Sequence, residues 1–208
     1  MSNFGFSQLR LVNPYAVAFR EARSAVGASE ILVNAQEFKS IADAVADCGL
    51  VIGTTAIGQR EVQHPLKRLE DAAKVVRTQT CGVALLFGSE KVGLSNDDLS
   101  HCHCLLRIPT VGDHRSMNLG QAVAVCLYEL VRQPDSISKP TQKNPATAAE
   151  LERITTVLTE ALAAVGYMTS EATPSTEAKT RRLVRRLNLS SSDAELLLGL
   201  LRHISRSN

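Results

Sequence analysis

The sequence lacks any apolar run that approaches the roughly 18 residues needed by a membrane-spanning helix. It also shows no basic and apolar leader before its first polar segment, so we expect a soluble protein that is not exported. Hydrophobic residues make up 44% and charged residues 21% of the chain, which is ordinary for a globular protein. A chain of 208 residues can form one main domain and a small second one.

The sequence also lacks an even set of cysteines and a large net charge. The five cysteines are odd in number, and most stand in apolar runs (Cys48, Cys81, Cys104 and Cys126). This favours reduced thiols and a cytoplasmic location over a disulfide framework. A net charge of +2 does not by itself indicate nucleic-acid binding, because phosphate attraction depends on local clusters of charge.

Short apolar runs alternate with helical patterns over the first 130 residues. The pattern predicts strands at Leu9–Val12, Ile31–Val33, Leu50–Gly53, Val83–Phe87 and Cys104–Ile108, and helices near Ala16–Ala25, Ser40–Ala46, Leu66–Val76 and Met117–Val131. This alternation is typical of an α/β domain with a parallel sheet covered by helices on both faces. We assign that domain to residues 1–132.

The remaining residues predict a linker and a small all-α domain. Residues 133–150 carry three prolines among polar residues, as linkers do. In residues 151–208, an amphipathic helix runs from Leu151 to Val165 and ends before Gly166. Leucines at 183 and 187 predict a second helix, and Ser192 with Glu195 forms a capping-box start for a third.

Two of the predicted strands end in polar loops that carry the clearest chemical signal. Gly88–Ser95 follows the strand at Val83, and the loop after Cys104–Ile108 leads to Ser116 and Asn118 at the start of an apolar helix. We place the helix N-cap at Ser116, so that free backbone N–H groups point out of the carboxyl end of the sheet. Ligands of α/β proteins bind at that end. A plain strand-to-helix turn and simple helix capping are the alternatives for these loops.

Other candidate motifs have little support. The segment Gly88–Gly93 matches neither the dinucleotide fingerprint nor the P-loop, which disfavours a nucleotide-binding oxidoreductase. Histidine and cysteine alternate over His101–Cys104, but neighbouring side chains of a strand point to opposite faces, and no second pair stands at zinc spacing. We therefore expect no metal site, and no thiol stands in a context that indicates a nucleophile.

Five basic residues cluster near the C-terminus at i, i+3 and i+4 spacing: Lys179, Arg181, Arg182, Arg185 and Arg186. On a helix, this spacing predicts a positive stripe able to contact RNA phosphates. A solvated helix face is the alternative.

Segments spread over nearly the whole chain match one known family. They are Leu11–Pro14, Gly27-Ala28, Val51–Ala56, Phe87–Leu94, Ser116–Leu119 and the tail from Leu151 to Ile204. On these segments the sequence resembles the SpoU/TrmH group of SPOUT ribose 2'-O-methyltransferases, and within it the TrmJ-type tRNA enzymes. Each segment alone is a weak signal, and together they are specific.

The resemblance implies a SPOUT-type parallel sheet with a deep trefoil knot that holds S-adenosylmethionine in a bent form. The cofactor-lining residues it implies are Thr54, Thr55, Ala56, Gly88, Ile108, Arg115, Ser116 and Met117. Glu90 would brace the loops, and Ser116 with Asn118 would hold the ribose 2'-oxygen that attacks the sulfonium methyl; these three are the implied catalytic residues. The resemblance also implies a homodimer and tRNA as the partner, with RNA contacts from the basic stripe and methylation in the anticodon loop.

The chain departs from the family pattern at its start. The family carries a first strand followed by an Asn-x-Gly-x-x-x-Arg motif, whose arginine assists proton removal, and this motif would lie just upstream of Met1. We interpret the departure as a truncation, and we expect the chain as given to bind cofactor weakly and methylate poorly, since its sheet would lack a central strand. If Met1 is genuine, the alternative is a non-catalytic RNA-binding or cofactor-sensing relative. The DNA upstream of Met1 discriminates between the two.

Overall fold

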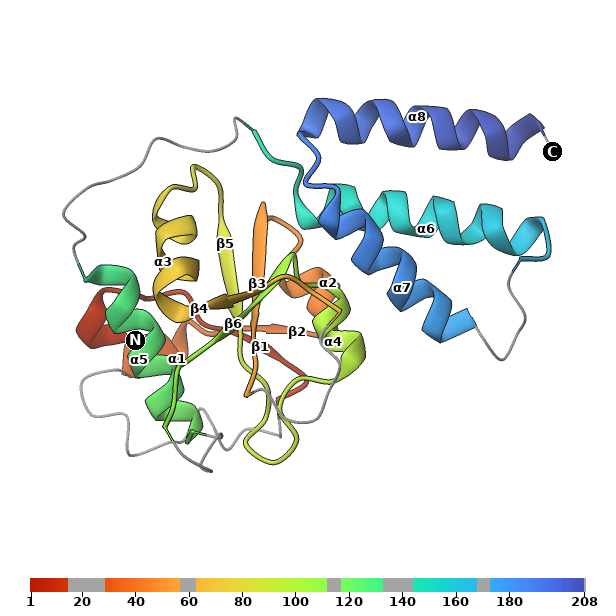
Figure 1. Ribbon diagram of the computed structural model, residues 1–208. Coiled ribbons are helices and arrows are strands. Elements are labelled where there is room, and N and C mark those ends of the chain that lie inside the picture. The colour runs from red at the N-terminus through yellow and green to blue at the C-terminus, as the bar shows by residue number, and fades with distance from the viewer. Residues whose placement is uncertain (15–28, 57–62, 112–116, 133–143, 168–172, 208) are drawn as a thin grey trace.

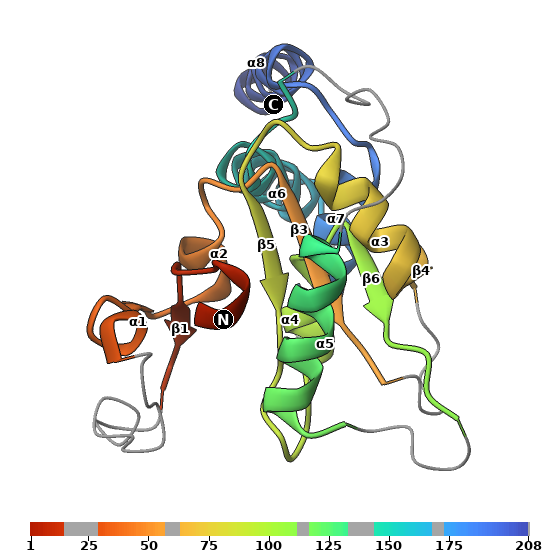
Figure 2. The same ribbon diagram turned by 90° about the vertical axis from the view of Figure 1, so that its left-hand side faces the viewer.

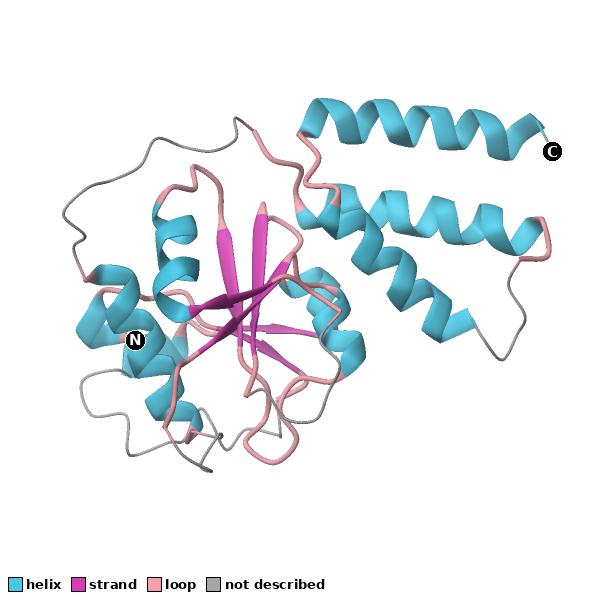
Figure 3. Cartoon of the chain, in the orientation of Figure 1, coloured by secondary structure: helices cyan, strands magenta, loops and turns pink. Residues whose placement is uncertain are grey.

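The computed structural model describes residues 1–14, 29–56, 63–111, 117–132, 144–167 and 173–207. These residues form an α/β unit followed by a group of three helices (Figure 1). Within the described residues, all strands lie in the first unit (Figure 3). The predicted fold class, α/β with a small all-α C-terminal part, is therefore confirmed. None of the described helices is long and apolar enough to cross a membrane.

The main sheet has four parallel strands in the order β4-β6-β3-β5. Their bounds are Leu50–Thr54 for β3, Leu66–Arg68 for β4, Val83–Leu86 for β5 and Cys104–Arg107 for β6. In the two central strands, Ile52 of β3 lies opposite Cys104 of β6, and Thr54 lies opposite Leu106. Because all four strands run the same way, their carboxyl ends share one edge.

A second, two-stranded parallel sheet pairs β1 (Arg10–Val12) with β2 (Gln36–Phe38). Figure 2 shows β1 apart from the main sheet, on the side of β5. The Arg10 guanidinium joins this small sheet to the rest of the unit, because Nη1 donates to the Ala44 carbonyl and Nη2 to the Asp47 carboxylate, each at 2.7 Å. The hydrogen bond from Arg10 lowers the pKa of Asp47 to about 2.

Helices cover both faces of the main sheet, as predicted, because successive residues of a strand point to opposite sides. One face lies against α2 (Ile41–Ala44), α4 (Asn96–Ser100) and their neighbours, and its buried core includes Val45, Val51, Leu99 and Leu105. The other face lies against α3 (Leu69–Arg77) and α5 (Leu119–Val131), and its core includes Ile52, Leu69, Ala72, Leu106 and Cys126. Both faces of β3 and β6 are thus buried in apolar cores, which explains why the sequences of these strands are continuous hydrophobic runs.

Two predictions of local structure are wrong. Ile31–Val33, predicted as a strand, belongs to helix α1 (Ser29–Val33), and the partner of β1 is the later segment β2. Leu66, predicted to lie on a helix face, lies in β4 opposite Leu105. Runs of so few apolar residues show no clear period, so they cannot distinguish a helix from a strand. The helix predicted near Ala16–Ala25 falls outside the described residues.

The C-terminal unit consists of α6 (Ala148–Ala164), α7 (Thr173–Arg186) and α8 (Ser191–Ser207). It has its own apolar core, formed by Ala146, Leu151, Ile154, Val184 and Ala194. Helix α6 begins inside the predicted 133–150 linker, since Thr147 and Glu150 form a capping box there. Gly166 follows its end with φ 73°, as predicted for a residue after a helix. Helix α8 starts earlier than predicted, because Ser190 rather than Ser192 accepts a hydrogen bond from the first turn, from Asp193 N–H at 3.2 Å.

The first turn of α6 attaches the helical unit to the α/β unit. Its backbone N–H groups at Ala148 and Ala149 donate to the carbonyls of Cys48 and Ala46, at 2.8 and 3.0 Å. A helix leaves its first N–H groups without partners inside the helix. Here the chain that follows α2 supplies the acceptors, and Ala148 also packs into the core beneath the sheet.

Candidate cofactor site at the carboxyl edge of the sheet

The carboxyl ends of three neighbouring strands are tied together by hydrogen bonds. The Thr54 hydroxyl, at the end of β3, donates to the carbonyl of Leu86 at the end of β5, at 2.9 Å. On the other side, Thr55 N–H donates to the carbonyl of Leu106 in β6, at 3.0 Å. Thr54 and Thr55 are half-buried and Ala56 is exposed, so this edge presents a fixed backbone with small side chains.

The loop after β5 closes tightly on itself and requires glycine at two positions. Gly93 N–H donates to the Ser89 carbonyl at 2.9 Å, and Gly93 has φ +68°, which other residues rarely adopt. A Cβ on Gly88 would lie 2.0 Å from the Gly93 carbonyl carbon and 2.2 Å from the Leu94 nitrogen. The backbone of Gly88 therefore lies against Gly93 and Leu94 of the same loop, and this close contact restricts the loop to one conformation.

This loop meets the start of α5 through two of the predicted site residues. The Asn118 side-chain amide Nδ2 donates to Glu90 Oε1 at 3.1 Å, although 28 residues separate them in the chain. The Asn118 Oδ1 accepts from Gln121 N–H at 3.3 Å, so Asn118 is the N-cap of α5. The placement of the N-cap at Ser116 is therefore wrong, because the helix begins two residues later. The inference that the two loops face a common site agrees with this contact.

The structure brings most of the predicted cofactor-lining residues to this edge. Ile108 follows β6 and Phe87 follows β5, and both are partly buried against the core on the α3 and α5 side of the sheet. Met117 immediately precedes the Asn118 cap and is half-buried. Arg115 and Ser116 lie outside the described residues, as does part of the loop through which the predicted knot would pass. The knot and the roles of these two residues stay predictions.

Small, apolar and hydrogen-bonding groups at this edge suit a nucleoside with a charged tail. Ile108 and Phe87 offer apolar surface for a base, while the threonine hydroxyls and loop backbone offer polar partners. Sequence reasoning missed the carbonyls of Leu86 and Leu106, which hold the strand ends, because no side-chain signal marks a backbone acceptor. The residues present therefore fit the cofactor that the sequence resemblance implies.

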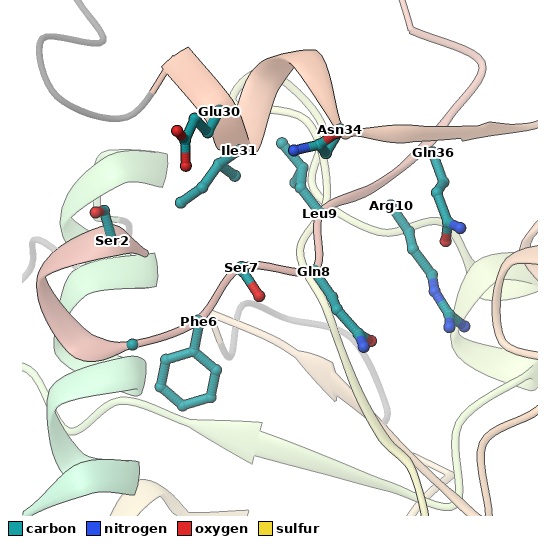
Figure 4. Close-up of a pocket in the computed structure, with 11 residues that line it drawn as sticks. Ser2, Phe6, Ser7, Gln8, Leu9, Arg10, Glu30, Ile31, Asn34 and Gln36 are labelled. Carbon is teal, nitrogen blue, oxygen red and sulfur yellow. The ribbon is translucent and has the colours of Figure 1, made fainter.

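A pocket elsewhere in the molecule does not coincide with this site. A cavity of about 520 Å³ lies among the residues before β1, helix α1 and the start of β2, and its lining includes Gln8, Arg10, Glu30 and Gln36 (Figure 4). It lies at the amino ends of β1 and β2, because its lining includes Arg10 and Gln36, the first residues of these strands. Ligands of α/β proteins bind at the carboxyl ends of strands, so we place the candidate site at the loops after β5 and β6.

The His101–Cys104 segment has a structural role. His103 Nδ1 accepts from Val51 N–H at 3.1 Å, and His103 N–H donates to the Val51 carbonyl at 2.8 Å. Burial lowers the pKa of His103 to about 3 and, together with the charge of Arg181, that of His101 to about 4. Burial also raises the pKa of the Cys102 and Cys104 thiols. Among the described residues, no three His, Cys, Asp or Glu side chains are placed to hold a metal ion.

The predicted basic stripe is divided between two faces of α7. Arg181 and Arg185 have side-chain exposures of 7% and 1%, and both contact Glu152 of α6. The Arg181 Nε donates to the Glu152 carboxylate at 3.0 Å, and its Nη1 donates to the Ser100 hydroxyl of α4, also at 3.0 Å. The prediction that these two arginines form part of an exposed stripe is therefore wrong. Their spacing puts them on one face, which is buried here, and no sequence pattern indicates that Glu152 is their partner.

The other three basic residues of α7 lie at i, i+3 and i+7. Lys179 and Arg186 are exposed and Arg182 is half-buried. Within the part of the chain that the structure describes, none of the three forms an ion pair with a carboxylate. This face keeps the positive charge that the sequence predicted.

These features define an α/β domain whose site is built from the loops after β5 and β6, with a basic helical unit at its side. The chain belongs to the SpoU rRNA methylase family, whose model matches residues 1–128. It is 32% identical to the tRNA (cytidine/uridine-2'-O-)-methyltransferase TrmJ of Citrobacter koseri, a match that covers 100% of this chain and 89% of that protein. It is 31% identical to an uncharacterized tRNA/rRNA methyltransferase of Haemophilus influenzae, over 99% of this chain and 86% of that protein.

Solved structures agree with this assignment. The crystal structure of TrmJ from Z. mobilis ZM4 matches with a TM-score of 0.88 and 32% identity, over 98% of this chain and 89% of that one. A probable methylase family protein from Haemophilus influenzae matches with a TM-score of 0.60 and 30% identity, over 99% and 87%. The fold therefore extends through the helical unit as well as the α/β unit.

Proposed function

We propose that the protein transfers a methyl group from S-adenosylmethionine to a ribose 2'-oxygen of tRNA. The observation that carries the proposal is the Asn118–Glu90 contact, which joins the two loops at the carboxyl edge of the sheet in a chain of the SpoU family. The similar proteins named as tRNA (cytidine/uridine-2'-O-)-methyltransferases support tRNA as the substrate. A tRNA substrate and five free thiols fit a cytoplasmic location.

The reaction is an in-line displacement, so alignment of the reacting groups is the main task of the protein. S-adenosylmethionine, when bound, supplies an electrophilic methyl group on a sulfonium. The residues proposed to hold it are Thr54, Thr55, Ala56, Gly88, Ile108, Arg115, Ser116 and Met117. Thr54 and Thr55 also keep the ends of β5 and β6 at a fixed distance from β3, which fixes the width of the site.

Glu90 and Asn118 act as positioning residues in this proposal. The Asn118 amide uses Oδ1 for the helix cap and Nδ2 for Glu90, so both ends of the amide group are held by the protein. Glu90 in turn holds the loop after β5 against the start of α5. Ser116, two residues before the cap, is the proposed contact to the ribose side of the reaction.

A homodimer is part of the proposal and has support from α5. This helix leaves large apolar side chains exposed on one side, at Val125 (37%), Tyr128 (54%) and Val131 (43%). The Phe4 ring adds to the same surface, edge-on to Tyr128 at 6.1 Å between ring centroids. A second copy covering this surface would bury it, and Tyr128→Arg should then lower the molecular mass measured by sedimentation.

Cofactor titration together with methyl transfer tests the proposed function. S-adenosylhomocysteine and NAD are titrated separately into the protein by calorimetry, and label transfer from methyl-labelled S-adenosylmethionine to tRNA is measured. We expect S-adenosylhomocysteine to bind in preference to NAD, and label to enter tRNA above the level of a control without protein. Binding of NAD alone contradicts the proposal, and binding of S-adenosylhomocysteine and tRNA without transfer favours a non-catalytic relative.

A further inference from the structure

Helix α8 leaves a row of large apolar side chains exposed on its outer side. Leu196, Leu200 and Ile204 are 64%, 55% and 57% exposed. They stand at i, i+4 and i+8, so they follow one side of the helix. The same helix contributes other residues, Ala194 and Leu201 among them, to the core of the helical unit. The exposed row, which we call the outer row, is therefore additional to the face that α8 buries.

A glycine in the same stretch of α8 leaves room for another backbone. Gly199 directly precedes Leu200, lies inside the helix and is exposed. Glycine is less favourable than alanine inside a helix. A Cβ on Gly199 would meet no atom within 4 Å, so packing within the chain does not require glycine at this position. The close approach of a second helix is a reason for its absence of a side chain.

The charged residues of α8 favour an antiparallel pair of these helices. Glu195 and Arg202 are exposed and seven residues apart, close to two turns, so both lie on the same side of α8. The ion pairs found between described residues include neither side chain. In a parallel pair of α8 helices like charges would meet. In an antiparallel pair, the acidic end of one helix lies beside the basic end of the other, and the helix dipoles also oppose each other favourably.

The outer row is also symmetric about its central residue. When two antiparallel α8 helices pack with their Leu200 residues opposite each other, Leu196 of each copy lies opposite Ile204 of the other. Glu195 of one copy then lies about three residues, or ~4.5 Å along the axis, from Arg202 of the other. Each copy covers the apolar row of the other, which is the self-complementarity of a two-fold interface.

We infer that the outer row of α8 is an interface between two copies of this chain, packed antiparallel about Leu200. This interface is separate from the one proposed at α5, because Figure 1 shows α5 and α8 at opposite ends of the molecule. A chain with two separate two-fold interfaces joins more than two copies. The protein therefore forms assemblies larger than a dimer as its concentration rises. The inference goes beyond the proposed function and does not depend on methyl transfer.

The first test measures molecular mass against concentration by sedimentation equilibrium, in the wild type and in the Tyr128→Arg background that disrupts the α5 surface. We expect Leu200→Arg to raise the dissociation constant of the α8 pair by about 100-fold or more in both backgrounds, because it places a charge from each copy at the centre of the interface. The matched control, Leu183→Arg, adds the same charge at an exposed leucine of α7 and should keep the mass of its background.

Two results of this test overturn the inference. One is a mass that Leu200→Arg leaves unchanged in both backgrounds, which includes a Tyr128→Arg protein that stays monomeric at every concentration. The other is an equal loss of association in Leu200→Arg and in the Leu183→Arg control, because the effect would then come from added charge and not from the outer row.

The second test examines the direction of the helices. In an antiparallel pair, Glu195→Arg and Arg202→Glu each place like charges beside one another, so each variant alone should raise the dissociation constant by about 10-fold. The double variant exchanges the two charges and should associate as the wild type does. Glu160→Arg, which makes the same change at an exposed glutamate of α6, serves as the control. Single variants that associate like the wild type, or a double variant that is no better than either, contradict the antiparallel pair.

The unfolding midpoint and S-adenosylhomocysteine affinity are measured for each α8 variant at concentrations where α8 is unpaired. We expect both to stay at wild-type values, because the substituted side chains are exposed and lie in the helical unit. Methyl transfer by the wild type separates this inference from the proposed function. If α8 pairs and tRNA is not methylated, only the proposed function fails. If tRNA is methylated and Leu200→Arg leaves the mass unchanged, only the inference about α8 fails.

Discussion

The two basic faces of α7 differ in what surrounds them. Arg181 and Arg185 are buried against Glu152 and the α4 helix, whereas Arg182 and Arg186 face outward without a carboxylate among the described residues. A buried ion pair contributes little net stability, but losing one partner of such a pair is costly because a buried charge is left without compensation. We therefore interpret the buried face as fixing the position of the helical unit, and the exposed face as the part that binds a partner.

Removing the shared carboxylate should have the largest effect. Glu152→Ala leaves the buried Arg185 guanidinium without its ion-pair partner and removes one of three carboxylates around Arg181, so we expect the free energy of unfolding to fall by about 3–5 kcal/mol. Urea denaturation measures this change. Glu160→Ala removes an exposed carboxylate from the same helix and should change stability by less than about 0.5 kcal/mol. Similar losses in both variants would remove the distinction between the two faces.

Acid should next destabilise the buried contact between α4 and α7, where Arg181 donates to Ser100 beside His101. His101 has a pKa of about 4 in the folded protein, lowered from 6.5 mainly by burial and then by Arg181. The unfolded state therefore binds protons first as the pH falls. The stability linked to this neutral histidine is fully present above pH 6.5 and is lost as the pH falls towards 4, by up to about 3 kcal/mol.

The measurement is urea denaturation across this pH range for the wild type and His101→Gln. We expect the stability of the variant to depend less on pH than that of the wild type. His203→Gln, at an exposed position of α8, serves as the control and should keep the wild-type profile. If the stability of His101→Gln depends on pH in the same way as that of the wild type, protonation of His101 does not destabilise the fold, and the prediction is wrong.

The contact between Asn118 and Glu90 at the candidate site should contribute less to stability, and more to activity, than the ion pairs of Glu152. Asn118→Ala removes the cap of α5, so we expect a loss of about 1 kcal/mol together with a large fall in methyl transfer. Asn118→Asp keeps an oxygen for the cap and loses the donor to Glu90, so activity should fall while stability stays near the wild type. Full activity of Asn118→Asp would argue against a positioning role for the Glu90 contact.

The smallest effect on stability is expected on the exposed face. Replacing Arg182 and Arg186 by glutamine removes a like-charge pair one turn apart, so the free energy of unfolding should rise by roughly 0.2–0.5 kcal/mol or stay unchanged. Urea denaturation of this double variant, beside Glu152→Ala, compares the two faces directly. A loss of several kcal/mol would mean that the exposed arginines also hold the fold.

The sequence predicted the features that depend on hydrophobic runs and chain direction. Strands β3, β5 and β6 follow from apolar segments bounded by glycine, proline or polar residues, and the meeting of the two loops follows from the shared carboxyl edge of parallel strands. The orientation of α7 could not be predicted, because spacing shows which residues share a face but not which face is buried. The partner of the buried face, Glu152, lies 29 residues away from Arg181.

The other two errors concern segments for which two local structures are equally compatible with the sequence. Ser116 and Asn118 are both good helix caps, and only the structure shows that Asn118 accepts from the first turn of α5. Ile31–Val33 has apolar residues suited to a strand, yet it forms a short helix before β2. In both cases the choice between two acceptable local structures depends on packing with distant parts of the chain.

The most direct test of the central claim is to map 2'-O-methyl groups on tRNA treated with the protein and S-adenosylmethionine. A methylated ribose resists alkaline cleavage at its own linkage, so the modified nucleotide is located as a gap in the hydrolysis ladder. The account predicts one new resistant position that requires S-adenosylmethionine and is weakened by Asn118→Asp. A complete ladder, obtained although the protein binds both tRNA and S-adenosylhomocysteine, would contradict it.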